Sequence, residues 1–407
     1  VNNLRLRVGF GITGVIPNDP YLSLYKFEYD AYGDVVDYNG NWIQTLKVSQ
    51  NANPNLKWET TREWNFGVDY GFFNNRLSGT VDFYIKDTHD LLYNYAVPSP
   101  PNLYGSTLAN VGKMRNMGVE VMITGIPVQT REFQWTTTLT LSHNKNTLLS
   151  LNNDLYETDN FQELWGGLSD PISVATHCME VGKGLGDYWG LKFAGYDKDG
   201  FALVEVRDQA TGEWVLKPFN TNLNILENRQ RLGNGMPSVY LGWNNTFTYK
   251  NIDLTMQFTG QFGYKILNTQ RCFYENNSIA YNRLKTAADL HPAINTDRTP
   301  VLDENGNQKM VRLSSSMDQG FWSDHLENGD FLKLTNLTLG YTLPLKGSIT
   351  KYLRNVRIYG SATNLFCITK YSGIDPEVSN YFMTPGVDNR DKYPTTRSFS
   401  VGMSFNF

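Results

Sequence analysis

Strict alternation of apolar residues with polar or small residues recurs in about ten segments of this 407-residue sequence. A period of two is the pattern of a β-strand, in which successive side chains point to opposite faces. In the last segment the apolar face consists of Phe399, Val401, Met403, Phe405 and Phe407. Serine, glycine and asparagine occupy the positions between them. The sequence therefore predicts an all-β fold whose strands each carry one continuously apolar face.

The connections between these segments alternate in length. Counted back from the C-terminus they are long, short, long, short, without exception, and the long ones span about 14–60, 89–116, 145–236, 265–330 and 365–395. A soluble sandwich has no reason to keep such an order, whereas outer-membrane barrels have short periplasmic turns and long extracellular loops. The alternation predicts a transmembrane antiparallel β-barrel in a bacterial outer membrane. Its long loops would lie outside the cell, and its C-terminus would lie in the periplasm.

Composition agrees with this class and argues against others. The net charge is −4, so no basic field indicates a nucleic-acid partner. No run of about 18 apolar residues is present, so no transmembrane helix is predicted. The three cysteines, Cys178, Cys272 and Cys367, are far apart and form no CxxC pair, which argues against a metal site. Their roles stay open at this point.

The strand count raises the question of how the barrel closes. Ten strands can close a barrel, but an unpaired strand edge in lipid costs several kcal/mol per unsatisfied backbone group. Either the chain closes on itself or another segment completes the barrel. No signal peptide precedes the first strand at Val1, which favours the second possibility.

The C-terminal strand also carries a motif. Ser400-x-Gly402-x-x-Phe405-x-Phe407 is similar to the C-terminal signal by which outer-membrane β-barrels are recognised for assembly. Gly402, Phe405 and Phe407 are therefore the predicted assembly-signal residues.

Several further stretches, taken in order, resemble the C-terminal half of a SusC/RagA-type TonB-dependent transporter. They are residues 53–59 (NPNLKWE), 71–79 (GFFNNRLSG), 116–120 (NMGVE), 331–344 (FLKLTNLTLGYTLP), 364–377 (NLFCITKYSGIDPE), and the block with Tyr393, Pro394, Arg397 and Phe407. The resemblance implies that residues 1–407 are about ten C-terminal strands of a 22-stranded barrel whose lumen holds a plug domain. It also implies a SusD-type surface lipoprotein as a lid and energy supplied through TonB.

The plug, the TonB-contacting segment and the first strands of that family have no counterpart here. We therefore expect this chain to be the second part of a transporter, split or cleaved upstream of Val1. The function implied by the resemblance is active import of a nutrient oligomer. A glycan is favoured by family frequency, and an oligopeptide is the alternative. No cofactor is implied.

No catalytic constellation stands out. The five histidines lie in unrelated loops or strand ends. Asp197-x-Asp199-Gly200 begins like a Ca²⁺ loop but lacks the distal glutamate, so a hairpin turn is the better interpretation. The flanking segments, 188–193 and 201–206, predict a β-hairpin inserted in the long loop 145–236. Asp375-Pro376-Glu377 is expected to fix the last extracellular loop.

Aromatic residues in the long loops are the candidate substrate contacts, because aromatic faces stack on sugar rings and amides bind hydroxyls or peptide groups. The set comprises Trp165, Tyr188, Trp189, Phe273, Tyr274, Phe321, Trp322, Asn380, Tyr381 and Phe382, with Asn276 and Asn277 as polar neighbours. Loop packing, plug contact or a lid interface would explain the same residues. The strand aromatics Trp64, Trp135, Trp243 and Tyr249 are interpreted as a lipid girdle.

Two other functions remain possible on the sequence. A self-contained ten-stranded outer-membrane protease of the omptin type would need paired Asp and His residues on its rim, and matched loop positions do not supply them. A passive porin would have no plug domain, a property that residues upstream of Val1 would decide.

Overall fold

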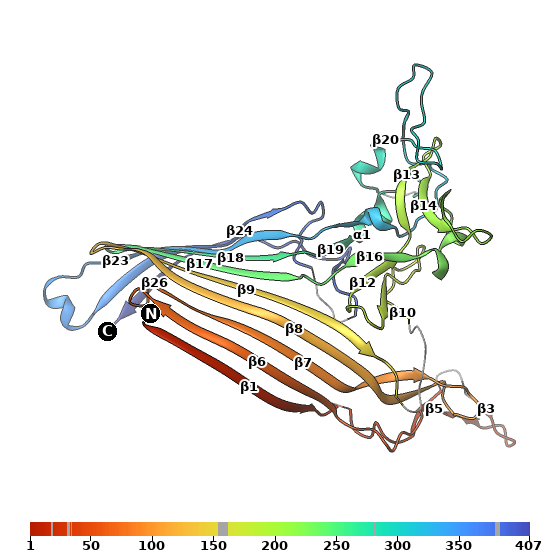
Figure 1. The fold of residues 1–407 in the computed structure, drawn as a ribbon, viewed down its shortest axis with the longest axis horizontal. Helices are drawn as coiled ribbons and strands as arrows, with labels where there is room; N and C mark the ends of the chain where they lie inside the picture. The colour runs from red at the N-terminus through yellow and green to blue at the C-terminus, as the bar shows by residue number, and fades with distance from the viewer. Residues whose placement is uncertain (18, 31–32, 34, 154–161, 280–281, 379–382) are drawn as a thin grey trace.

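The computed structural model describes residues 1–407 except 18, 31–32, 34, 154–161, 280–281 and 379–382. Its main feature is one curved antiparallel sheet of ten strands, here called the wall (Figure 1). In spatial order these are β1 (Asn3–Val15), β6 (Glu59–Phe72), β7 (Leu77–Ala96), β8 (Ser106–Gln129), β9 (Phe133–Ser150), β17 (Val239–Tyr249), β18 (Ile252–Phe262), β23 (Phe331–Leu343), β24 (Asn355–Thr369) and β26 (Ser398–Asn406). The predicted all-β fold with about ten antiparallel strands is confirmed.

The wall is a partial barrel. Among the described residues β1 pairs only with β6, and β26 pairs only with β24, so both outer edges of the sheet are open. Each edge strand presents a row of backbone N–H and C=O groups that no ladder bond satisfies. A closed barrel has no such edges, so the ten strands form an arc and not a closed barrel.

The two faces of the wall differ in the way that the alternation predicts. The apolar face is widely exposed: Leu6 exposes 75% and Val401 84% of their surface. The opposite face carries polar groups, and Arg7 of β1 forms ion pairs with Asp69 of β6 and Asp82 of β7 at 2.8 and 3.0 Å. A strand between lipid and a watery lumen needs this division.

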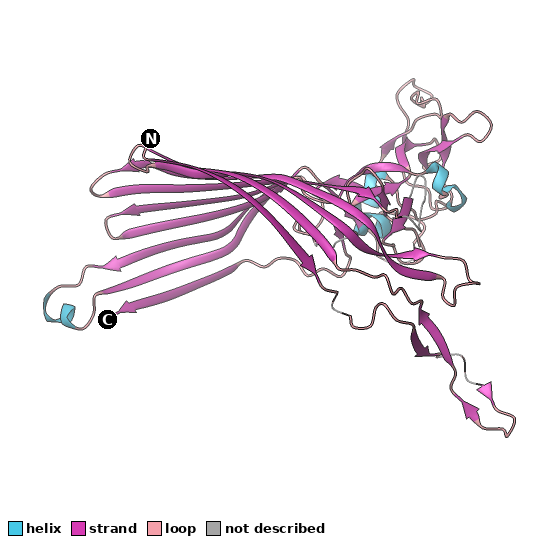
Figure 2. Ribbon diagram, turned by 60° about the horizontal axis from the view of Figure 1, so that its bottom comes forward, coloured by secondary structure: helices cyan, strands magenta, loops and turns pink. Residues whose placement is uncertain are grey.

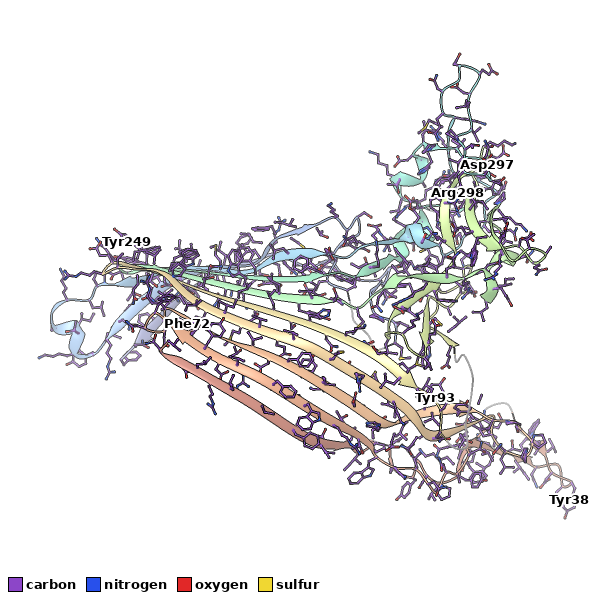
Figure 3. The ribbon with its side chains drawn as sticks, viewed as in Figure 1. Tyr38, Phe72, Tyr93, Tyr249, Asp297 and Arg298 are labelled. Atoms are coloured by element: carbon purple, nitrogen blue, oxygen red, sulfur yellow. The ribbon has the colours of Figure 1, made fainter. Side chains whose placement is uncertain are left out.

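Aromatic residues recur on the apolar face. Trp64, Trp243 and Tyr249 are partly exposed there, and Trp135 donates its indole N–H to Asn245 Oδ1 at 3.1 Å. Figure 3 shows Phe72 and Tyr249 near the end of the wall where the short turns lie. The lipid-girdle role of these aromatic residues stays a prediction.

The connections lie at the two ends of the wall as expected, with one correction. Residues 73–76, 130–132, 250–251 and 344–354 connect strands at the end that also holds both termini (Figure 1). At the other end, the expected loop 89–116 is mostly strand, because β7 runs to Ala96 and only residues 97–105 connect it to β8. Pairing with β8 continues along β7 beyond the polar residues 87–90, and Arg115 Nε of β8 lies 2.6 Å from Asp87 Oδ1 of β7. A strand needs an apolar face only where it crosses lipid.

The alternation of residues 331–334 is out of phase with the rest of β23, which predicts a β-bulge there or a strand end above the lipid. The ladder between β18 and β23 shifts register there, because Gln257 is opposite Asn336 and Phe258 is opposite Leu334. Thr335 is the extra residue, and its hydroxyl donates to the Gln257 carbonyl at 2.9 Å. Of the two alternatives, the β-bulge is the one that the structure has.

The described residues of three long connections, within 162–236, 263–330 and 370–397, pack together at the far end of the wall and are here called the rim body. It holds small sheets made of β10 (Gln162–Trp165), β11 (His177–Glu180), β12 (Asp187–Gly190) and β16 (Gln230–Asn234); β13 (Lys192–Tyr196), β14 (Ala202–Arg207) and β15 (Trp214–Pro218); β22 (Leu326–Asn328), β19 (Lys265–Asn268) and β25 (Val387–Asp388); and β20 (His291–Pro292) with β21 (Met310–Val311). β13 and β14 pair antiparallel around the Asp197–Gly200 turn.

Helices are short. The described chain has one α-helix, α1 (Thr269–Tyr274), in the rim body. The 3-10 turns are η1 (Thr221–Leu223), η2 (Leu226–Asn228), η3 (Lys285–Ala288), η4 (Ser323–His325) and η5 (Gly347–Lys351). Among the described residues, no helix has the length and apolar character needed to cross a bilayer.

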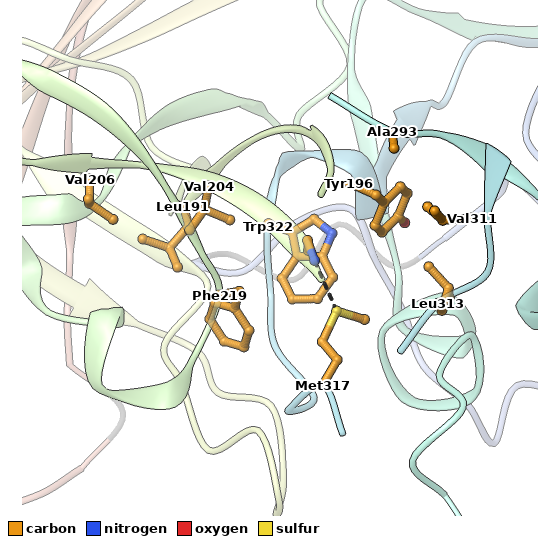
Figure 4. Close-up of a cluster of buried hydrophobic side chains, with 11 residues drawn as sticks. Leu191, Tyr196, Val204, Val206, Phe219, Ala293, Val311, Leu313, Met317 and Trp322 are labelled. Carbon is orange, nitrogen blue, oxygen red and sulfur yellow. Dashed lines mark hydrogen bonds between the residues drawn. The ribbon is translucent and has the colours of Figure 1, made fainter. Parts of the chain in front are cut away.

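Two hydrophobic clusters hold the rim body together. One joins β13–β15 to the segment 291–322 and is centred on Trp322, Phe219 and Met317 (Figure 4). The other joins Leu168 and Tyr188 of the connection 162–236 to Leu267, Phe273 and further residues of the connection 263–330. Each cluster contains residues of more than one connection, so these connections pack together as one unit.

The long connection between β1 and β6 does not belong to the rim body. β2 (Lys26–Tyr29) pairs with β5 (Leu46–Gln50), and β3 (Val35–Val36) pairs with β4 (Trp42–Ile43). Together they form a narrow arm that extends away from the wall (Figure 2). Tyr38, at its tip in Figure 3, exposes 96% of its surface.

Candidate functional site

The structure separates the predicted substrate contacts into three groups. Tyr188, Phe273, Phe321 and Trp322 expose 4% or less of their surface and belong to the two hydrophobic clusters. Trp165, Trp189 and Tyr274 are half-buried. Asn380, Tyr381 and Phe382 lie outside the described residues. Of the polar neighbours, Asn276 is buried and Asn277 is half-buried.

Burial changes the interpretation of the first group. Trp322 lies 5.1 Å from Phe219 between ring centroids, and Tyr188 donates its hydroxyl to the Pro385 carbonyl at 3.1 Å. Side chains with this little exposed surface bind other parts of the rim body, and aromatic cores of this kind contribute mainly to stability. Loop packing, the alternative considered for these aromatics, describes what the four residues do in this structure.

Two of the predicted residues, Phe273 and Tyr274, line a cavity of about 610 Å³ in the rim body. Its other lining residues are Gly167, Leu168, Ser169, Thr269, Val387, Asn389, Arg390 and Asp391. A second cavity of about 310 Å³ shares Gly167, Leu168, Val387 and Asn389 with it and reaches Thr176 and Thr384. The two cavities adjoin, and their size is within the range of small-molecule sites.

Backbone pairing brings the walls of this cavity together from distant parts of the chain. β19 and β25 run parallel, with Leu267 opposite Val387 and Asn268 opposite Asp388. Asn268 caps α1 by accepting the Arg271 backbone N–H at 3.2 Å. Gln270 Nε2 then donates to the Arg390 carbonyl at 3.0 Å. These bonds hold residues 389–391 beside α1, whose last residues are Phe273 and Tyr274.

Arg390 is the cation of the cavity lining. Its Cζ lies 3.7 Å from the centroid of the Phe273 ring and 6.0 Å from that of Tyr274. Its Nη2 donates to Ser169 Oγ at 2.8 Å. A guanidinium over an aromatic face is attracted by the ring quadrupole, so Phe273 and Ser169 together hold the Arg390 side chain in place.

A charged network stabilises the other side of α1. Arg271 lies 2.6 Å from Glu275, 2.6 Å from Asp324 and 3.4 Å from Glu327. Burial alone would lower the pKa of Arg271, but the Asp324 and Glu275 carboxylates outweigh it and raise this pKa. Arg271 therefore stays charged and links α1 to η4 through its ion pair with Asp324.

The two buried histidines of the rim body are neutral packing groups. His177 donates Nε2–H to the Pro385 carbonyl at 3.0 Å, and Thr176 Oγ1 is 2.9 Å from its Nδ1. Burial lowers the pKa of His177 to about 4. Burial and the Arg271 charge lower the pKa of His325 to about 3. Within the described residues, no cluster of three or more His, Cys, Asp or Glu has the arrangement of a metal site.

Other residues singled out in the sequence have defined positions. Asp197 Oδ1 accepts the backbone N–H groups of Asp199 and Phe201, each at 2.9 Å, as a turn residue does. Gly402 packs under Tyr359, whose ring would lie 2.5 Å from an added Cβ. Phe405 and Phe407 are exposed on the apolar face of the wall. Their role as an assembly signal stays a prediction.

Sequence reasoning missed Arg390, Asn389 and Ser169. These residues show no alternation and belong to no motif. Asn389 and Arg390 come beside α1 because β19 and β25 pair across more than a hundred residues of chain, and Ser169 meets Arg390 from a third segment. Arg390 has no acidic residue four positions away in the sequence, but this weak indication of a free arginine does not distinguish it from other loop arginines.

Comparisons with known proteins agree on the class of the chain. The family model described as "TonB dependent receptor-like, beta-barrel" matches residues 2–166. TonB-dependent receptor SusC of Bacteroides thetaiotaomicron is 28% identical over all of this chain and 38% of its own length. TonB-dependent receptor P3 of Formosa agariphila is 27% identical over all of this chain and 40% of its own length.

A solved structure of the RagAB peptide transporter superposes with a TM-score of 0.77 at 26% identity, covering 99% of this chain and 41% of the matched chain. The chain therefore spans about 40% of the length of the relatives that it matches.

Proposed function

We propose, on the premise that this chain is the C-terminal portion of a β-barrel of the SusC/RagA-type TonB-dependent receptors, that the whole receptor imports a nutrient oligomer across the outer membrane. The observation that carries the proposal is the likeness over 99% of the chain to the RagAB transporter structure, at a TM-score of 0.77. The open ten-stranded wall with one lipid-suited face supports the same assignment.

In this proposal the chain is not an enzyme. The wall supplies part of the barrel, with its apolar face toward lipid and its polar face toward the lumen. The short turns and the C-terminus lie in the periplasm, and the rim body lies outside the cell, where the connections between β9 and β17 and between β18 and β23 are its long extracellular loops. The remaining barrel strands, the plug and the segment that contacts TonB belong to the part of the receptor outside this chain.

Partners follow from the same premise. A SusD-like surface lipoprotein would close over the rim body as a lid, and TonB would supply energy by acting on the plug. Import needs no protein nucleophile, because a site that binds outside and releases when the plug moves is sufficient. This explains why the buried histidines, which are held neutral, need have no chemical role.

The substrate is proposed to be a glycan, with oligopeptide as the alternative. One structural neighbour, RagAB, is a peptide transporter, whereas the preference for glycan rests on how often this family carries glycans. Of the predicted contacts, the half-buried Trp165, Trp189 and Tyr274 retain surface for a ligand. Asn380, Tyr381 and Phe382 remain proposed contacts.

The test is uptake by cells that carry the whole receptor and its lipoprotein. Cells would be given fluorescent maltohexaose, oligogalacturonide and hexapeptide probes, with and without TonB and with a protonophore. We expect at least one probe to enter only when TonB and the proton gradient are intact. Uptake that survives loss of both would indicate a passive porin, and cleavage of the peptide by the purified receptor would indicate a protease.

A further inference from the structure

We propose that the 610 Å³ cavity binds a single carboxylate group of the imported oligomer, and that Arg390 is the residue that pairs with it. This inference rests on the proposed import function and specifies the chemistry of its substrate. A uronic-acid unit of a glycan and a carboxyl group of a peptide share this chemistry.

The Arg390 guanidinium is available to a ligand. Within the described chain, the one hydrogen bond that its side chain makes is to Ser169 Oγ, and none of its nitrogens lies within 4 Å of a described carboxylate oxygen. Two other rim arginines are held by carboxylates: Arg231 pairs with Asp187 and Arg298 with Glu205, each at 2.6 Å. Arg390 therefore keeps N–H donors that can form the bidentate pair that carboxylates prefer.

The guanidinium is also preorganised. Stacking on Phe273 at 3.7 Å fixes the plane of the guanidinium, and the Ser169 bond fixes its rotation. A ligand carboxylate would then meet donors that are already oriented, so little side-chain entropy is lost on binding. Phe273 thus contributes to the site from its buried position, as the platform under Arg390 and not as a direct stacking surface.

The remaining lining of the cavity restricts the ligand further. Asp391 follows Arg390 along the chain and lines the same cavity. A second negative group on the ligand would be placed near this carboxylate and repelled. Leu168 and Val387 supply apolar surface, and Asn389 supplies an amide. The cavity therefore suits a unit with one carboxylate beside neutral hydrogen-bonding groups, and the adjoining 310 Å³ cavity gives room for the next unit.

The experiment is calorimetric titration of the purified whole receptor with its lipoprotein. One pair of probes is hexagalacturonic acid and its fully methyl-esterified form. The other is hexa-alanine and its C-terminal amide. We expect the free carboxylate of at least one pair to bind about tenfold tighter than its neutralised partner, because hydrogen bonds to a charged group are worth that much.

Variants assign that preference to Arg390. In Arg390→Gln the tenfold preference should disappear while the neutralised probe binds as before. Arg390→Lys keeps the charge but loses the planar fork, so it should keep only part of the preference. Arg131→Gln removes the same charge from an exposed turn at the opposite end of the wall and should leave the preference intact. Heat-modifiable migration on gels checks that each variant is folded.

Absence of a preference in both probe pairs, or a preference that Arg390→Gln retains, would overturn the proposal. Either result can be separated from failure of the proposed function. TonB-dependent uptake measured in the same cells would persist if only the carboxylate site were wrong, and would be absent if import itself were wrong.

Discussion

Val401 in the wall exposes 84% of its surface, whereas Leu203 in the rim body is completely buried. The wall turns its large apolar side chains outward and keeps ion pairs such as Arg7–Asp69 on its inner face. The rim body does the reverse, with aromatic clusters inside and charged groups such as Arg298 outside (Figure 3). The same residue types thus follow opposite rules within one chain, because one region faces lipid and the other faces water.

The largest expected effect tests whether buried aromatics matter more in the rim body than exposed ones in the wall. Trp322→Ala empties a site that is 4% exposed and should destabilise the rim body by about 3–5 kcal/mol. Trp243→Ala, at 37% exposure on the apolar face, should lose its stacking with Phe258 and its indole hydrogen bond to Thr137 Oγ1, about 2 kcal/mol together. Limited proteolysis of the assembled receptor would measure both.

Equal protease sensitivity of the two tryptophan variants would remove the distinction between the regions. Substrate affinity should fall in Trp322→Ala only as far as the rim body unfolds. A loss of affinity in a rim body that still resists protease would instead restore Trp322 as a direct contact.

The second test places a charge on each face of one wall strand. Val81→Lys puts an ammonium group on the apolar face of β7 and should cost about 2–4 kcal/mol near the middle of the bilayer. Thr80→Lys puts the same group on the polar face of the same strand and should be tolerated. The fraction of heat-modifiable, assembled receptor in outer membranes would report the difference, and equal assembly of the two variants would contradict the assignment of faces.

The third test uses pH, to which the two regions should respond differently. His177 and His325 have folded pKa values of about 4 and about 3, below the ordinary value of 6.5. Between pH 6.5 and 4 the unfolded rim body binds protons that the folded one excludes, so stability is lost as pH falls. From pH 7 to 5.5 we expect a loss of about 2 kcal/mol in the rim body, since one pKa unit corresponds to about 1.4 kcal/mol.

Hydrogen exchange corrected for intrinsic rates at the two pH values would measure this loss by segment. His177→Gln combined with His325→Gln should remove most of the difference from the rim body. An equal response of the wall segments would show that the acid effect does not come from these histidines.

The smallest expected effect concerns an ion pair between the wall and the rim body. Lys333 of the wall is 5% exposed and lies 2.7 Å from Glu377 of the rim body. Glu377→Gln leaves the ammonium group without its charged partner, but Glu377 is half-exposed, so we expect only about 1 kcal/mol of local loosening. Hydrogen exchange of residues 370–378 would rise. Glu304→Gln, on an exposed turn of the rim body, is the matched control and should change nothing there.

The two regions also differ in how far the sequence predicts them. Wall strands have one face toward lipid, so period-two alternation is visible and all ten were anticipated. β14 is buried on both faces over Ala202–Val206, Glu205 included, so no alternation of exposed and buried positions marks how it packs. The extension of β7 through Asp87–Asp90 was missed because polar residues end the alternation without ending the backbone ladder.

The candidate site was partly predictable for the same reason. Aromatic residues in long loops are visible as a class, and Phe273 and Tyr274 do line the cavity. Which of the aromatics are buried depends on contacts such as His177 with Pro385, which are 208 positions apart. No local pattern encodes that separation, so Arg390 and the core role of Trp322 required the folded chain.

The central claim is that these ten strands are an arc of a larger transport barrel. Electron cryomicroscopy of the receptor, purified from native outer membranes with its lipoprotein, tests it most directly. We expect β1 and β26 each to pair with a strand outside residues 1–407, and a plug to fill the lumen. Direct hydrogen bonding of β1 to β26 in a closed ten-stranded barrel would contradict it.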